Sequence, residues 1–231
     1  VKALAAPATV DFSEVVYESE TFPNSFKSNA NLAGIVFPQN VTKTASAAFQ
    51  KTGMTSVTLL KGISYGSNAF DSCASLVSVT VEEGVTEIGN YMFQNTKLTD
   101  VTLPNSVTKI GASAFNGCSL TTINFGQGVK TIENSAFQNC GELTEIILPD
   151  ATETLGQNAF GDCPKLAKIS LGKNMKTLEA YCFVGYSKGC PLLGDIICRA
   201  TTPPTLKDDY GTGPFGGGWN PVAGKDVPAE N

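Results

Sequence analysis

The sequence predicts a solenoid of about eight coils of 22–23 residues, with short parallel strands, helical or irregular turns, and a cap at each end. Three observations predict this fold: a phenylalanine that returns every 21–23 residues, an apolar triad with strand spacing, and a corner of small residues after each triad. Self-similarity at such a period is typical of proteins in which each repeat contacts only its neighbours. We therefore expect an extended surface rather than a catalytic pocket.

The phenylalanine column marks one turn in every coil. Its surrounding phrase is clearest in residues 110–118, IGASAFNGC, and in residues 155–163, LGQNAFGDC. The members of the column are Phe26, Phe49, Phe70, Phe93, Phe115, Phe137, Phe160 and Phe183.

An apolar triad spaced L-x-x-V-x-L follows each phenylalanine and predicts a strand. The alternation in its second half is the period of a strand with one buried face, and the intervening residues are rich in Thr and Ser. The triads are Leu32/Ile35/Phe37, Met54/Val57/Leu59, Leu76/Val79/Val81, Leu98/Val101/Leu103, Leu120/Ile123/Phe125, Leu143/Ile146/Leu148 and Leu166/Ile169/Leu171, with a weaker eighth at Leu193/Ile196/Cys198.

A corner and a second extended segment complete the coil. Small or Pro-containing residues follow the triad, as in Leu103-Pro-Asn-Ser-Val107, and such residues suit tight corners. A short apolar pair such as Val107/Ile110 comes next, before a helical or irregular turn that carries the phenylalanine. Each coil is thus expected to run from a strand through a corner and a short extended segment to this turn.

The two ends of the chain do not follow the repeat. We expect residues 1–25 to form an N-terminal cap or flank, residues 26–205 the solenoid, and residues 206–231 a Gly/Pro-rich C-terminal cap or tail. A solenoid needs caps because its end coils otherwise expose core. The last segment contains the only tryptophan, Trp219, which we expect to pack in the cap; the alternative is an exposed ring that stacks on a sugar or anchors a partner. The finish at Asn231 is consistent with a cut from a longer protein.

The repeated unit I-G-x-x-A-F-x-x-C-x-x-L-x-x-V-x-L-P, best at residues 76–171, resembles the leucine-rich repeats of the BspA-like class of bacterial cell-surface proteins. The resemblance covers roughly residues 26–205 and implies a secreted or surface-exposed bacterial protein. It departs from the plain leucine-rich pattern because no regular Asn follows the strand. Other side chains must therefore satisfy that corner.

Composition excludes several partners. The chain has 16 basic and 21 acidic side chains and a net charge of −5, without a basic stripe, so nucleic acid is not an expected partner. No apolar run approaches the roughly 18–20 residues that span a bilayer, so we expect no membrane insertion by this segment.

Seven cysteines occur, and the repeat dictates their positions. Cys73, Cys118, Cys140 and Cys163 lie three residues after the phenylalanine, and Cys190 takes that slot after a four-residue insertion. We expect stacked free thiols in the core. A disulfide between neighbouring coils is a second possibility, and a zinc site is a third, although the chain has no C-x-x-C pair.

The chain contains no histidine, which excludes Ser-His-Asp, Cys-His and histidine acid–base catalysis. No phosphate-binding G-x-x-x-x-G-K-[ST] loop occurs, and no cofactor or metal ion is expected. Asp100 and Glu145 are the carboxylates nearest to a glycosidase pair, but two coil spacings put them roughly 10 Å apart. We expect no enzyme activity.

The outward strand positions form the candidate binding face. The expected binding residues are Thr58, Thr80, Thr102, Asn124, Asp100, Thr122 and Glu145. Threonine also suits any exposed strand, so the hydroxyl-rich face has a purely structural explanation as well. The functional interpretation is adhesion to a host or microbial surface protein or to a glycan. The alternative is a structural spacer that projects another domain from the cell surface.

Overall fold

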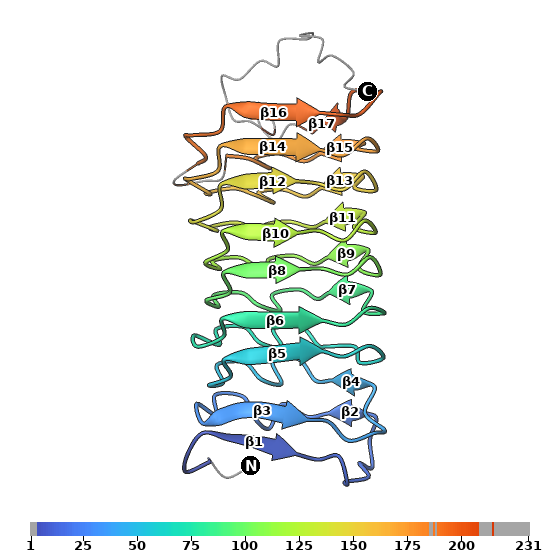
Figure 1. The fold of residues 1–231 in the computed structure, drawn as a ribbon, viewed down its shortest axis with the longest axis vertical. Coiled ribbons are helices and arrows are strands. Elements are labelled where there is room, and N and C mark those ends of the chain that lie inside the picture. The colour runs from blue at the N-terminus through green and yellow to red at the C-terminus, as the bar shows by residue number, and fades with distance from the viewer. Residues whose placement is uncertain (1–3, 185–186, 188, 208–213, 215–231) are drawn as a thin grey trace.

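The structure is a computed structural model that describes residues 4–184, 187, 189–207 and 214. Coils stack along one long axis from the N-terminus to the last described strands, and strands of successive coils lie above one another (Figure 1). The predicted solenoid is confirmed. The expectations for Trp219 and for most of residues 206–231 lie outside the described residues.

The apolar triads form the longer column of strands. Its pairs are parallel, and apart from a register shift after Ala8 in the first pair the coils are in register, so Val57 lies beside Val79 and Ile146 beside Ile169. The members are β1 (Ala8–Asp11), β3 (Leu32–Val36), β5 (Ser56–Leu59), β6 (Ser78–Val81), β8 (Asp100–Thr102), β10 (Thr122–Asn124), β12 (Glu145–Ile147), β14 (Lys168–Leu171) and β16 (Asp195–Cys198). We call the solvent side of this column the strand face.

The short segments after the corners form a second column. From β7 to β17 they make one continuous parallel sheet of six strands. The members are β2 (Thr21–Phe22), β4 (Lys43–Thr44), β7 (Glu87–Ile88), β9 (Lys109–Ile110), β11 (Thr131–Ile132), β13 (Thr154–Leu155), β15 (Thr177–Leu178) and β17 (Thr205–Leu206). This six-stranded sheet holds the coils together across two interruptions of the first column, from β6 to β8 and from β10 to β12.

The third side of each coil is an irregular turn, and the described residues contain no helix. Residues two before and two after the phenylalanine take the left-handed conformation, with φ of 53° at Ser113 and 72° at Gly117. Asn, Ser, Asp and Gly fill most of these positions because they tolerate positive φ. The turn backbones bond between coils, since Ser113, Phe115 and Gly117 donate their N–H groups to carbonyl oxygens of the next coil.

The phenylalanine rings form the centre of the core. From Phe49 to Phe183 seven rings stack in sequence, with centroids 5.2–6.4 Å apart and interplanar angles of 2–19°. Phe26 joins this stack through Phe22, whose ring lies 6.0 Å from that of Phe26 and 5.9 Å from that of Phe49. The predicted column of rings is therefore continuous, except that Phe22, which is not part of the repeat, lies between Phe26 and Phe49.

All seven cysteines are free. In the repeated slot the thiol donates to the carbonyl oxygen of the preceding coil's phenylalanine, as from Cys118 to Phe93 at 3.1 Å. Thr96 fills the same slot, but its hydroxyl donates to the carbonyl oxygen of Phe93 in its own coil, at 2.9 Å. One expectation is wrong: Cys198 is exposed rather than buried, because it lies at the end of β16, the edge strand of its sheet, beyond which no further described strand pairs.

Individual side chains satisfy the corners in place of a regular Asn. The Ser106 hydroxyl donates to the Val85 carbonyl and accepts from the Gly84 amide, both at 2.8 Å. Thr152 donates to the Val129 carbonyl at 2.9 Å. Different side chains therefore form the same kind of hydrogen bond at this corner, to the backbone of the preceding coil.

Candidate binding surface

All seven predicted binding residues lie exposed on the strand face. The register joins them in rows, with Thr58 beside Thr80, Thr102 beside Asn124, and Asp100 beside Thr122. The Asn124 amide donates to the Thr102 hydroxyl at 3.3 Å. The centre of the face is therefore a surface of hydroxyl and amide groups.

The face changes character at β12. The column that begins with Thr58 continues as Ile147, Ser170 and Ile197. Ile147 is 58% exposed, whereas Ser170 between the two isoleucines is only 9% exposed. This column is consequently more apolar in its C-terminal part than from β5 to β10.

The carboxylates of the face do not converge. Asp100 lies on β8 and Glu145 on β12, with β10 between them in the stack (Figure 1). The Glu145 carboxylate forms an ion pair with the Lys168 amine at 2.8 Å. The hydrogen bond within this pair raises the pKa of the Lys168 amine. Glu145 therefore belongs to a surface ion pair on this face rather than to a two-carboxylate site.

The column of strands is interrupted three times within the described residues: between β3 and β5, between β6 and β8, and between β10 and β12. No backbone hydrogen bond joins the strands across these breaks, except for one from Gly53 to Asn29 and one from Lys97 to Leu76, just outside the strands. The sequence analysis did not indicate these breaks. Two of the three follow a coil with phenylalanine in the third apolar slot, Phe37 and Phe125. We infer that this larger side chain keeps the next strand at a distance.

The break between β10 and β12 forms a groove of about 510 Å³ on the strand face. Two apolar side chains of its floor, Ile123 and Phe125, are half-buried, whereas Val101 and Leu103 of the coil before are buried. The groove also includes the exposed ends of both strands. Its walls carry Thr121, Thr122, Asn124, Gln127, Thr144, Glu145, Ile147, Asp150 and Arg199.

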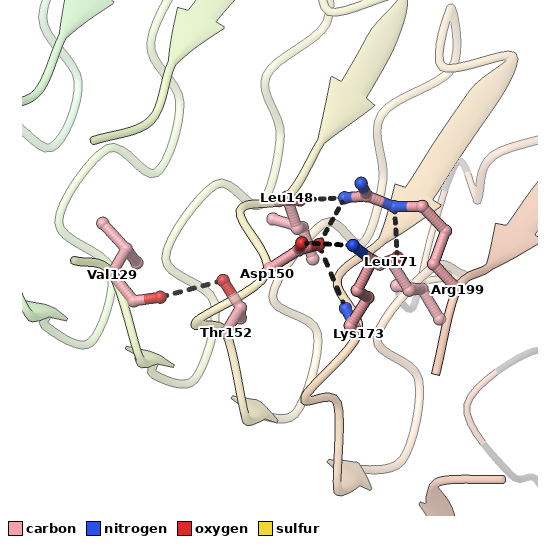
Figure 2. Close-up of polar contacts among 7 residues, drawn as sticks. All are labelled: Val129, Leu148, Asp150, Thr152, Leu171, Lys173 and Arg199. Atoms are coloured by element: carbon pink, nitrogen blue, oxygen red, sulfur yellow. Dashed lines mark hydrogen bonds and ion pairs between the residues drawn. The ribbon is translucent and has the colours of Figure 1, made fainter. Parts of the chain in front are cut away.

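Arg199 closes one end of this groove, and its side chain reaches back across two coils (Figure 2). The guanidinium donates to the carbonyl oxygens of Leu171 at 3.2 Å and Leu148 at 2.9 Å. It also pairs with Asp150 at 3.2 Å, and the second oxygen of Asp150 pairs with Lys173 at 3.3 Å. No local sequence pattern indicates this contact, because Arg199 and Leu148 are 51 residues apart.

A second hollow, of about 630 Å³, lies beside the second sheet. Its polar groups already bond between coils: Asn134 accepts from the Gln157 amide at 2.9 Å, and Glu133 accepts from Ala112 and pairs with Lys109 at 3.0 Å. These contacts give Asn134 and Glu133 a structural role.

The thiols offer no reactive or metal-binding group in the core. Burial raises the pKa of Cys118 and Cys190 to about 11, and raises the pKa of Cys140 well above its ordinary value. A protonated thiol is a weak nucleophile and a poor metal ligand. Within the described part of the chain, no three Cys, Asp or Glu side chains gather in a metal-binding arrangement. The same residues include no helix with the length and apolarity to cross a membrane.

A model of BspA-type leucine-rich repeat regions matches residues 10–65 and 63–189 in six copies. Among solved structures, a leucine-rich cell surface protein from Faecalibacterium prausnitzii is similar with a TM-score of 0.56 and 22% identity. The match covers 84% of this chain and 60% of that one. A leucine-rich repeat protein from Eubacterium ventriosum gives a TM-score of 0.52 and 22% identity, covering 80% of this chain and 60% of that one.

These structural similarities support the fold. The chain spans about three fifths of the length of these two neighbours. A comparison with curated proteins finds no significant match.

Proposed function

The chain belongs to the BspA-type leucine-rich repeat family, and from that premise we propose that it is a binding module of a bacterial surface. The strand face recognises a host or microbial surface protein or a glycan and performs no chemistry. Residues of the family repeat specify the coil and leave the outward strand positions free to vary. Binding by this module is therefore a property of the outward positions.

One observation carries the proposal. The strands of the first column turn their inward side chains into the core. Their outward side chains on the strand face stay exposed in adjacent rows, among them Thr58, Thr80, Thr102 and Asn124. Repeat proteins bind partners over such extended surfaces through many modest contacts. The neighbour from Faecalibacterium prausnitzii is described as a cell surface protein, which supports the same location for this chain.

The test is a binding array of extracellular-matrix proteins, plasma proteins and glycans, probed with the labelled protein. Thr102→Arg places a long charged side chain at the centre of the face, and we expect it to abolish a saturable signal. Thr86→Arg is the matched control, because Thr86 is exposed just before β7 on the second sheet. Equal binding by both variants would contradict the proposal, and silence across the array would favour the spacer.

A further inference from the structure

We propose that the groove between β10 and β12 binds a neutral oligosaccharide. The proposal rests on the proposed function and assigns a subsite and a ligand class to the strand face. Four features of the groove carry it: unpaired backbone groups, an apolar floor, compensated charges and fixed polar side chains.

The backbone of the two strands supplies the first feature. Thr122–Asn124 pairs only with β8, and Glu145–Ile147 pairs only with β14. Each strand therefore turns a set of N–H and C=O groups toward the groove, and such groups require a polar partner.

A peptide strand does not fit between them. Inserting one would hold β10 and β12 about 9.6 Å apart, twice the usual strand spacing. Cα atoms of the two strands come within 8 Å of each other. Hydroxyl groups are smaller, and each donates and accepts, so they can reach unpaired groups that a strand cannot.

The floor supplies the second feature. Ile123 and Phe125 are half-buried there, and the exposed Ile147 lies on the adjacent wall. A pyranose ring has an apolar C–H face and a polar rim of hydroxyl groups. This shape matches an apolar floor between polar walls, and removing such apolar area from water favours binding.

The acidic groups of the groove are bonded to basic groups. Glu145 bonds to Lys168 at 2.8 Å, and Asp150 bonds to Arg199 at 3.2 Å and to Lys173 at 3.3 Å. No acidic group of these bonds is left without a basic partner, and the bonded groups have only a small net charge. The groove therefore has no strong field that would require a charged ligand.

The polar side chains are held in place before binding. Arg199 is fixed by two carbonyl oxygens and a carboxylate, and Asn124 is fixed by Thr102 at 3.3 Å. Side chains that are already ordered lose less conformational entropy when a ligand arrives. The groove therefore presents a fixed set of amide, hydroxyl and guanidinium groups.

A matched pair of variants tests the groove. Thr122→Arg puts a long side chain into it, whereas Ser56→Arg changes the same column of the face on β5, where the pairing with β6 is intact. Both positions are exposed, so both variants are expected to fold. The probes are neutral tri- and tetrasaccharides of glucose, galactose and mannose, with sialylated and sulfated counterparts, measured by isothermal titration calorimetry.

We expect a neutral oligosaccharide to bind the unaltered protein and Ser56→Arg with the same Kd, and Thr122→Arg about tenfold or more weakly. We also expect that Kd to stay constant when salt is raised about tenfold, since screening acts on charges. Equal losses in both variants, or binding of the acidic sugars alone, would overturn the proposal.

The outcomes for the two proposals differ. A protein ligand found on the array and lost with Thr102→Arg, without any neutral sugar bound, would leave the strand face as a binding surface and refute the sugar subsite. Failure of every probe of either kind would refute both.

Discussion

The interior of the solenoid and its strand face share one register but differ in how the sequence uses it. In the interior every coil repeats the same side chain, so Phe93, Phe115 and Phe137 occupy equivalent places in one stack. On the strand face the equivalent places hold Thr102, Asn124 and Ile147. Packing dictates the first set because each ring must fit the rings above and below, whereas solvent imposes no such condition on the second.

This difference separates stability from recognition. A substitution in the interior removes packing and lowers the free energy of unfolding. A substitution on the strand face alters the surface that contacts a partner and so changes the affinity. Substitutions in the two regions should therefore differ in their effect on stability, from large in the interior to small on the face.

Phe137→Ala should have the largest effect. The ring is fully buried and lies 5.2 Å from both Phe115 and Phe160, so its removal leaves a cavity in the middle of the stack. We expect a loss of about 3–5 kcal/mol in the free energy of unfolding, measured by urea denaturation. Phe137→Leu is the control, with a loss of about 1.5 kcal/mol, because it keeps most of the volume. Similar losses for both would contradict the cavity explanation.

Alkaline pH should destabilise the interior through its thiols. Burial raises the pKa of Cys118 from the ordinary 9.0 to about 11, so the folded state holds a proton that the unfolded state releases above pH 9. The stabilisation is complete below pH 9 and is lost as pH rises toward 11, by about 1.4 kcal/mol per pH unit for this thiol.

Cys118→Thr isolates that contribution, because Thr96 already fills the same slot in the preceding coil. Urea unfolding at a series of pH values, under reducing conditions, should show a shallower decline above pH 9 for the variant. Parallel curves for the two proteins would contradict the assignment to Cys118.

Tyr91→Asn should stabilise the turn. Tyr91 has φ of 56°, and the equivalent positions in other coils hold Asn68 and Asn158, which tolerate this conformation better. We expect a gain of about 1 kcal/mol in thermal or urea unfolding. A loss of stability would mean that the half-exposed tyrosine ring contributes more packing than its backbone strain costs.

Thr58→Arg and Thr102→Arg should have the smallest effect on stability. Both threonines are exposed on the strand face, and surface changes of this kind stay within about 0.5 kcal/mol. Unfolding curves that coincide with that of the unaltered protein are the expected result. A larger loss at either position would show that the face contributes to the fold as well as to recognition.

Sequence reasoning predicted the features that repeat. The phenylalanine column, the triads and the thiol slot follow from periodicity, because identical neighbours impose identical requirements on each coil. The exposure of Thr58, Thr80, Thr102 and Asn124 followed from the strand alternation alone.

Features that do not recur in every coil were not predicted. The groove between β10 and β12 lies at one of three breaks in the column of strands, and the third apolar slot before these breaks holds no single residue type that would indicate them. Arg199 reaches Leu148 across two coils, so neither residue has a local signature. The irregular turn was ambiguous because Lys51, Tyr91 and Tyr181 occupy left-handed positions that their residue types do not indicate.

The most direct test of the separation between stability and recognition is an arginine scan along the face. Thr58, Thr80, Thr102 and Asn124 are each replaced by Arg, and the Kd for a ligand from the array is measured beside the free energy of unfolding. We expect unchanged stability throughout and a loss of affinity that is largest at Thr102 and Asn124 and smaller toward Thr58. An affinity that is the same in all four variants, or that falls only where stability falls, would contradict the assignment of binding to the strand face.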